Sequence, residues 1–190
     1  EANLNAVKIE GLPERYVVFY GRIGEEKGIK ILMEIWNALP DIPLVVMGSG
    51  PLENEFKIWA RKHDNVHFLG YTQHDRCLSI VKGGEFVVFP SIWYEGCSMV
   101  EIETESLGKG LIATDLGFST EAIKDGVNGY KIKLGDIEAF RKCILKLWNE
   151  PTRISQIGKN ARHDYEQKYK PDDNYEQLME IYKKMIGSYL

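Results

Sequence analysis

The chain has 190 residues, of which 44% are hydrophobic and 27% charged, with a net charge of −4 at pH 7; this is the composition of one globular domain with its own core. The acidic balance argues against nucleic acid as a partner, and no apolar run is long enough to span a bilayer. Three widely spaced cysteines without a C-x-x-C pair favour free thiols in a cytoplasmic protein. The four histidines lack metal-site spacing, so we expect no metal.

Strand-like and helical patterns alternate along the chain. Strands are predicted at residues 16–23, 44–50, 66–71, 86–91, 111–115 and 129–133. Helices are predicted at residues 27–39, 51–63, 74–83, 99–108, 120–126, 136–149, 152–169 and 172–188. This alternation indicates an α/β fold with a Rossmann-like, mostly parallel sheet and helices on both faces, followed by a helical C-terminal tail. We divide the chain into a linker-like start (1–12), a Rossmann-like domain (13–170) and a C-terminal helix (171–190).

The first loop that follows a predicted strand carries two cations. In sheets of this kind ligands bind at the carboxyl ends of the strands, where the strand order reverses. The segment "GRIGEEKGI" places Arg22 and Lys27 five residues apart among glycines. Such a loop suits a diphosphate, although two solvated surface charges would look the same.

The second such loop contains glycines as well. Its sequence "GSGPLE" (48–53) is similar to the dinucleotide fingerprint G-x-G-x-x-G, but it lacks the third glycine, and no suitable acidic residue ends the following strand. The pattern favours a tight strand-to-helix turn and disfavours a nicotinamide-dependent oxidoreductase.

The helix predicted at 99–108 carries a glutamate, Glu103, in the middle of its apolar arc. The rest of that arc consists of Met99, Val100, Ile102, Ser106 and Leu107. The wheel predicts a solvated opposite face made of Glu101, Thr104 and Glu105. An unpaired buried carboxylate is costly, so two interpretations stay open: a core glutamate with a partner, or a ligand-binding glutamate at a pocket edge.

The start of this helix has the pattern of a capping box. Ser98 is the expected N-cap and Glu101 the residue that reaches back to its amide. The free amides and the positive end of the helix dipole would then face the crevice as an anion site. Glu95, just before the helix, and Glu103, on it, form a pair of carboxylates suited to a hydroxyl-rich ligand.

Taken in order, these stretches resemble the carboxyl-terminal, donor-binding half of a GT-B glycosyltransferase of the GT4 family. The resemblance rests on "GRIGEEKG", "GSGPLE", "FLGY", "PSIWYEG", two glutamates separated by seven residues, "LIATD" and "EAIKDGVNGY". It extends over roughly residues 13 to 133. The sequence departs from the family pattern at "EGCS", "TES" and "GKG", and the first of these leaves the donor sugar open.

The resemblance implies where a donor diphosphate would bind. Arg22 and Lys27 match the cationic pair that holds the diphosphate. Cys97, Ser98 and Met99 match the start of the helix, where the backbone approaches the distal phosphate. With these groups in place the resemblance implies no metal and no further cofactor.

The resemblance also implies roles for three residues at the sugar and base. Glu103 matches the glutamate that binds the ribose hydroxyls of the nucleotide. Glu95 matches the glutamate near the transferred sugar, which makes it the candidate catalytic residue. Thr72 falls where the edge of the base meets the main chain.

The implied activity is retaining hexosyl transfer from a UDP- or GDP-sugar to an acceptor hydroxyl, in cell-surface or capsular polysaccharide synthesis. Residues 13–170 would be the nucleotide-sugar-binding domain. We expect the acceptor-binding amino-terminal half to be missing, this fragment to be inactive alone, and any contact with the inner face of the membrane to come through that half. Two alternatives stay open: a sugar-nucleotide epimerase of the same fold and a non-catalytic nucleotide-sugar-binding domain.

Overall fold

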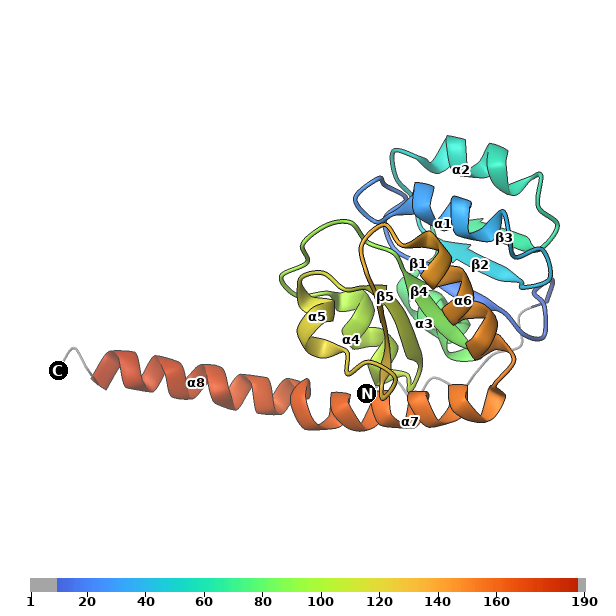
Figure 1. Cartoon of the computed structure of the whole chain (residues 1–190). Coiled ribbons are helices and arrows are strands. Elements are labelled where there is room, and N and C mark those ends of the chain that lie inside the picture. The colour runs from blue at the N-terminus through green and yellow to red at the C-terminus, as the bar shows by residue number, and fades with distance from the viewer. Residues whose placement is uncertain (1–9, 188–190) are drawn as a thin grey trace.

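The computed structural model describes residues 10–187, so most of the linker-like segment expected at residues 1–12 lies outside the described part. Six parallel strands form one sheet in the order β3-β2-β1-β4-β5-β6 (Figure 1). The strands are β1 (Val17–Tyr20), β2 (Leu44–Met47), β3 (Val66–Gly70), β4 (Phe86–Phe89), β5 (Gly110–Thr114) and β6 (Gly129–Ile132). The Rossmann-like parallel sheet predicted from the alternating pattern is confirmed.

Each strand connects to the next through a helix, as parallel pairing requires. The helices are α1 (Ile29–Trp36), α2 (Glu53–Ala60), α3 (His74–Gly83), α4 (Met99–Ser106), α5 (Phe118–Ala122), α6 (Ile137–Trp148), α7 (Pro151–Lys168) and α8 (Pro171–Gly187). Every predicted element is present, and most end one to four residues inside the predicted ranges because the sequence pattern continues into the flanking turns.

Both faces of the sheet are covered, because successive side chains of a strand point to opposite faces. Val17 and Phe19 of β1 pack into a core cluster shared with α1, α2 and α6. Val18 and Tyr20 pack into a second cluster with residues of α3. This explains why the central strands are continuous apolar runs rather than alternating ones.

Helix α7 contacts α4 and α6, which belong to opposite faces of the sheet. The last helix, α8, continues away from the sheet and forms the helical tail (Figure 1). None of the helices in residues 10–187 combines the length and the hydropathy that crossing a membrane requires.

The strand order reverses between β1 and β4, which are neighbours in the sheet. The loops that follow these two strands are tied together: the Ile92 amide donates to the Glu26 carbonyl over 3.0 Å. Gly28 in the first loop has φ 72°, and a Cβ there would lie 1.8 Å from the Pro90 carbonyl oxygen. Glycine therefore allows the two loops to approach at the switch point, where this type of fold binds its ligands.

Candidate functional site

A pocket of about 360 Å³ opens at the carboxyl ends of β1, β2 and β3. Residues from the ends of these strands, the loops after them and the first turn of α3 line it: Tyr20, Gly21, Arg22, Met47, Gly48, Ser49, Tyr71, Thr72, His74 and Cys77. Two of the predicted site residues, Arg22 and Thr72, are among them. The strand-end loops thus form a concave site where the sequence pattern predicted one.

Glu103 lies beside this pocket, near two residues of its wall. Its Oε1 is 3.8 Å from His74 Nε2, and its side chain is 21% exposed. Burial raises the pKa of Glu103, whereas the neighbouring His74 and Tyr20 lower it. The Tyr20 hydroxyl is itself fixed by a 2.8 Å hydrogen bond that it donates to the Val100 carbonyl. Glu103 is therefore a partly buried carboxylate, held at the edge of a pocket with polar neighbours.

The helical wheel was wrong about the rest of α4. The face expected to be solvated is the buried one, because Glu101, Thr104 and Glu105 are only 1%, 0% and 5% exposed. Met99, assigned to the core, is 59% exposed. The reason is that α7 packs against α4, and a wheel of one helix contains no information about which neighbour will cover it.

Buried polar groups meet this face of α4. Ser119 donates to Glu101 Oε1 over 2.8 Å, and Asn128 Nδ2 lies 3.0 Å from Asp164 Oδ2 and 3.4 Å from Glu105 Oε1. The remaining oxygens, Glu101 Oε2 and Glu105 Oε2, have no hydrogen-bond partner among the described residues. Burial raises the pKa of Glu101 to about 7 and that of Glu105 to about 8, so both carboxyls keep their proton to a higher pH than an exposed glutamate does.

Only half of the expected capping box forms at the start of α4. Ser98 is the N-cap, and its Oγ accepts a 3.4 Å hydrogen bond from the Glu101 amide. The Glu101 carboxylate turns instead to Ser119. Glu101 therefore does not occupy the Ser98 amide, and the positive end of the helix lies beside the exposed Cys97 and Met99.

Lys27 and Glu95 form an ion pair across the tied loops after β1 and β4. Their side chains are 21% and 15% exposed, and Lys27 Nζ contacts Glu95 Oε1. Ser91 Oγ also lies 3.3 Å from Glu95 Oε1, and the Phe118 amide donates to the Glu95 carbonyl over 2.9 Å. Lys27 from the loop after β1 and Ser91 from the loop of Glu95 itself thus hold this carboxylate, while Phe118 fixes the Glu95 backbone.

The other predicted residues are placed less specifically. Arg22, 66% exposed, pairs with Glu26 over 3.2 Å, and Thr72 Oγ1 donates to the Gly70 carbonyl over 3.3 Å. The structure therefore groups Arg22 and Thr72 at the pocket with Glu103 beside them, and it joins Lys27 to Glu95 in a separate pair.

Two polar residues that line the pocket, Tyr20 and His74, were not predicted from the sequence. The available signal was position: Tyr20 is the last residue of β1 and His74 the first of α3. Ends of strands and the helix starts that follow them line the crevice in this type of sheet.

The doubly wound sheet and its crevice define a Rossmann-like domain. A family model described as "Glycosyl transferases group 1" matches residues 4–164, and the chain belongs to that family. Among curated relatives, D-rhamnosyltransferase WbpZ of Pseudomonas aeruginosa is 30% identical over 83% of the chain and 42% of its own length. O-antigen chain mannosyltransferase C of Escherichia coli is 26% identical over 94% of the chain and 49% of its own length. The chain thus spans half or less of the length of these relatives.

Solved structures share the fold. Sucrose-phosphate synthase from Thermosynechococcus elongatus has a TM-score of 0.83 at 23% identity, covering 93% of the chain and 47% of that protein. Anabaena HepE in complex with UDP-glucose has a TM-score of 0.80 at 21% identity, covering 90% and 49%. At these identities the likeness concerns the fold, and it confirms the GT-B assignment.

Proposed function

We propose that the chain is the donor-binding half of a retaining GT4 glycosyltransferase and that its crevice binds a nucleoside diphosphate sugar. The observation that carries this proposal is the placement of Glu103, a partly buried carboxylate beside a strand-end pocket, in a chain of the group 1 glycosyl transferase family. A carboxylate there can accept hydrogen bonds from both hydroxyls of a ribose. The UDP and UDP-glucose bound in the HepE structures support a ligand of this class.

In this proposal the pocket holds the nucleoside and the tied loops hold the diphosphate. Thr72 marks the base end of the pocket and Glu103 the ribose. Lys27 and Arg22, each now paired with a glutamate, turn to the diphosphate, assisted by the amides at the start of α4 near Cys97, Ser98 and Met99.

The chemical role of the site is to stabilise the leaving group. When the bond between sugar and diphosphate breaks, negative charge grows on the diphosphate, and fixed cations and amides lower the energy of that charge. Glu95 lies next to Lys27 and, released from it, faces the sugar. The donor itself supplies the transferred group, so the proposal requires no further cofactor.

The acceptor, the rest of the enzyme and its location belong to the proposal as well. We infer an acceptor-binding half in a longer chain, cytoplasmic and working at the inner face of the membrane, in synthesis of a cell-surface or capsular polysaccharide. The relatives named above, a rhamnosyltransferase and an O-antigen mannosyltransferase, support that pathway class.

The first test is a thermal-shift screen of the chain with UDP, GDP and their sugars. A ligand that binds only the folded state stabilises it by about 2.7 kcal/mol at a concentration of 100 times its Kd. We expect one nucleoside diphosphate to raise the melting temperature and the matching monophosphate to raise it less, because Lys27 and the helix start recognise the second phosphate. A melting temperature that no nucleotide changes would contradict the proposal.

The second test concerns Glu103 and the ribose. Glu103→Gln retains the size of the side chain and should leave the fold intact, but it should cost about 1–2 kcal/mol of nucleotide affinity. A 2′,3′-dideoxynucleotide should bind the variant and the original protein almost equally by calorimetry, because the hydroxyl partners are absent.

The matched control is Glu180→Gln, a change at an exposed glutamate of α8, which should alter neither affinity. The alternative of a core glutamate predicts the reverse result. Glu103→Gln would then lose much stability, and its preference for a ribonucleotide over the 2′,3′-dideoxynucleotide would not change. Zero coupling between Glu103 and the ribose hydroxyls in this cycle would refute the assignment.

A further inference from the structure

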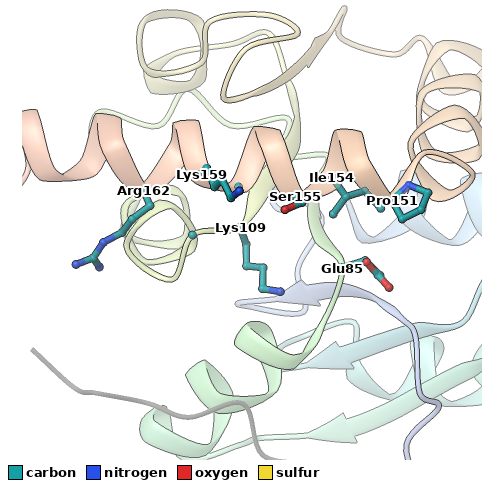
Figure 2. A pocket seen from close by; sticks show the side chains of 9 residues that line it. Glu85, Lys109, Pro151, Ile154, Ser155, Lys159 and Arg162 are labelled. Carbon is teal, nitrogen blue, oxygen red and sulfur yellow. The ribbon is translucent and has the colours of Figure 1, made fainter.

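A larger cavity, of about 510 Å³, lies at the other edge of the sheet, away from the proposed donor site. Its walls come from α7 and from the turns that precede β4 and β5, at the amino ends of those strands (Figure 2). The lining residues are Glu85, Gly108, Lys109, Pro151, Ile154, Ser155, Gly158, Lys159 and Arg162. None of these residues has a role in nucleotide binding as proposed above.

The charged groups around this cavity are mainly cationic. Lys109 and Lys159 contribute positive charge, Arg162 is paired with Glu166 at 2.7 Å, and Glu85 is the one acidic residue in the lining. The Glu85 carboxylate is already paired with Arg15 Nε at 2.6 Å. Glu85 also interacts with Lys109, so it offsets one of these positive charges. With Arg15 counted, the cationic groups around the cavity still outnumber it, which favours an anionic ligand.

Lys109 is the cation most withdrawn from water. It projects from the turn before β5 into the cavity, in the direction of Glu85 (Figure 2), and its Nζ donates to the neutral Gly84 carbonyl over 2.5 Å. Burial lowers the pKa of Lys109; Glu85 raises it, and the neighbouring Lys82 lowers it further. An ammonium in these surroundings gains from an anion that contacts it directly.

Two glycines, Gly108 and Gly158, are part of the cavity lining. Gly158 of α7 packs so closely on the turn that a Cβ there would lie 2.3 Å from the Gly108 carbonyl oxygen. The two glycines keep side chains out of this contact, while Pro151 and Ile154 form an apolar wall nearer the start of α7 (Figure 2). The cavity thus combines a cationic end with an apolar side, which is a common arrangement in small-molecule sites.

We propose that this cavity binds a small phosphate monoester, with its phosphate at Lys109 and Lys159 and its organic part against Pro151 and Ile154. Arg162 points away from the other labelled side chains (Figure 2) and donates to Glu166 and the Ser106 carbonyl, so the site does not depend on it. This second site shares no lining residue with the strand-end pocket. Its test does not depend on the proposed glycosyl transfer.

The test follows backbone amide NMR shifts of the chain during titration with phenyl phosphate and with inorganic phosphate. We expect saturable shifts at Gly108, Lys109 and Gly158, and tighter binding of phenyl phosphate, because only it reaches the apolar wall. Lys109→Met should weaken phenyl phosphate binding about tenfold, which corresponds to one lost charged contact. Lys159→Met should weaken it about threefold.

The control is Lys142→Met, a change of an exposed lysine on α6, which should leave the dissociation constant unchanged. If Lys109→Met does not fold, Lys159→Met decides the question. Equal binding by Lys159→Met and the original protein, or shifts confined to the strand-end loops around Arg22 and Thr72, would overturn the proposal. Equal affinity for phenyl phosphate and inorganic phosphate would refute the proposed contact of the organic group with Pro151 and Ile154.

Discussion

Lys27→Ala should weaken binding of the nucleoside diphosphate by about 1.5–3 kcal/mol, roughly a 10- to 150-fold rise in Kd. Lys27 lies in the loop that the switch-point contacts hold against the loop after β4, and it is only partly exposed. A charged hydrogen bond formed there is weakly screened by solvent, so its loss is costly. Calorimetry with the nucleoside diphosphate and the monophosphate measures the change in affinity. Most of the loss of affinity should appear with the diphosphate.

Lys27→Ala also leaves Glu95 without its cationic partner. The control must therefore separate a loss of diphosphate binding from a loss of stability. Lys30→Ala removes a lysine from the same region whose contact with Glu25 is long, at 3.4 Å, and exposed; it should leave both affinity and stability nearly unchanged. Denaturation of Lys27→Ala should show a modest loss of stability, because Ser91 still contacts Glu95. Equal diphosphate affinity in the variant and the original protein would remove Lys27 from the binding site.

The free energy of unfolding should fall by about 6 kcal/mol between about pH 5 and about pH 8.5 as Glu101 and Glu105 lose their protons. Burial raises their pKa values from 4.5 to about 7 and about 8. Between the unfolded and folded values the folded state binds more protons than the unfolded chain, so stability is greatest at the acidic end and declines as pH rises. Ionisation of either carboxyl is costly, because one oxygen of each group is buried and has no hydrogen-bond partner among the described residues.

Charged residues around Glu101 and Glu105 change the size of this loss of stability but not its direction. Asp164 raises the pKa of Glu105, while Lys168 and Lys124 at the rim lower it. Burial is the largest cause for Glu105, as it is for Glu101, so the proton is retained despite the lysines.

Urea denaturation across this pH range measures the effect, and the double variant E101Q/E105Q isolates it. Two amides cannot ionise, so the variant's stability should be nearly flat over the window and should exceed that of the original protein at the alkaline end. Glu180→Gln, at an exposed position of α8, should leave the decline in place. A decline of the same size in the double variant would assign it to other groups.

The fold was readable from the sequence because its signals are local. Alternating apolar runs and amphipathic segments repeat at lengths typical of strands and helices, and the runs "YVVFY" and "FVVF" indicated strands covered on both faces. The loops that form the crevice followed from the same pattern, since ligands bind at the carboxyl ends of parallel strands. Arg22 was predicted in this way, Thr72 was predicted from the family resemblance, and Tyr20 and His74 lay within reach of the strand-end reasoning.

The sequence alone determined the order of strands and helices, the parallel sheet and the loops at its carboxyl edge, because these depend on residues close together in the chain. Only the tertiary structure decided which face of α4 is buried and that Lys27 meets Glu95, 68 residues away. It also decided that α7 closes a second cavity over Lys109. Those features arise where distant segments pack, and there a polar side chain such as Glu101 or Glu105 is buried because a neighbour covers it, whatever its place on a helical wheel.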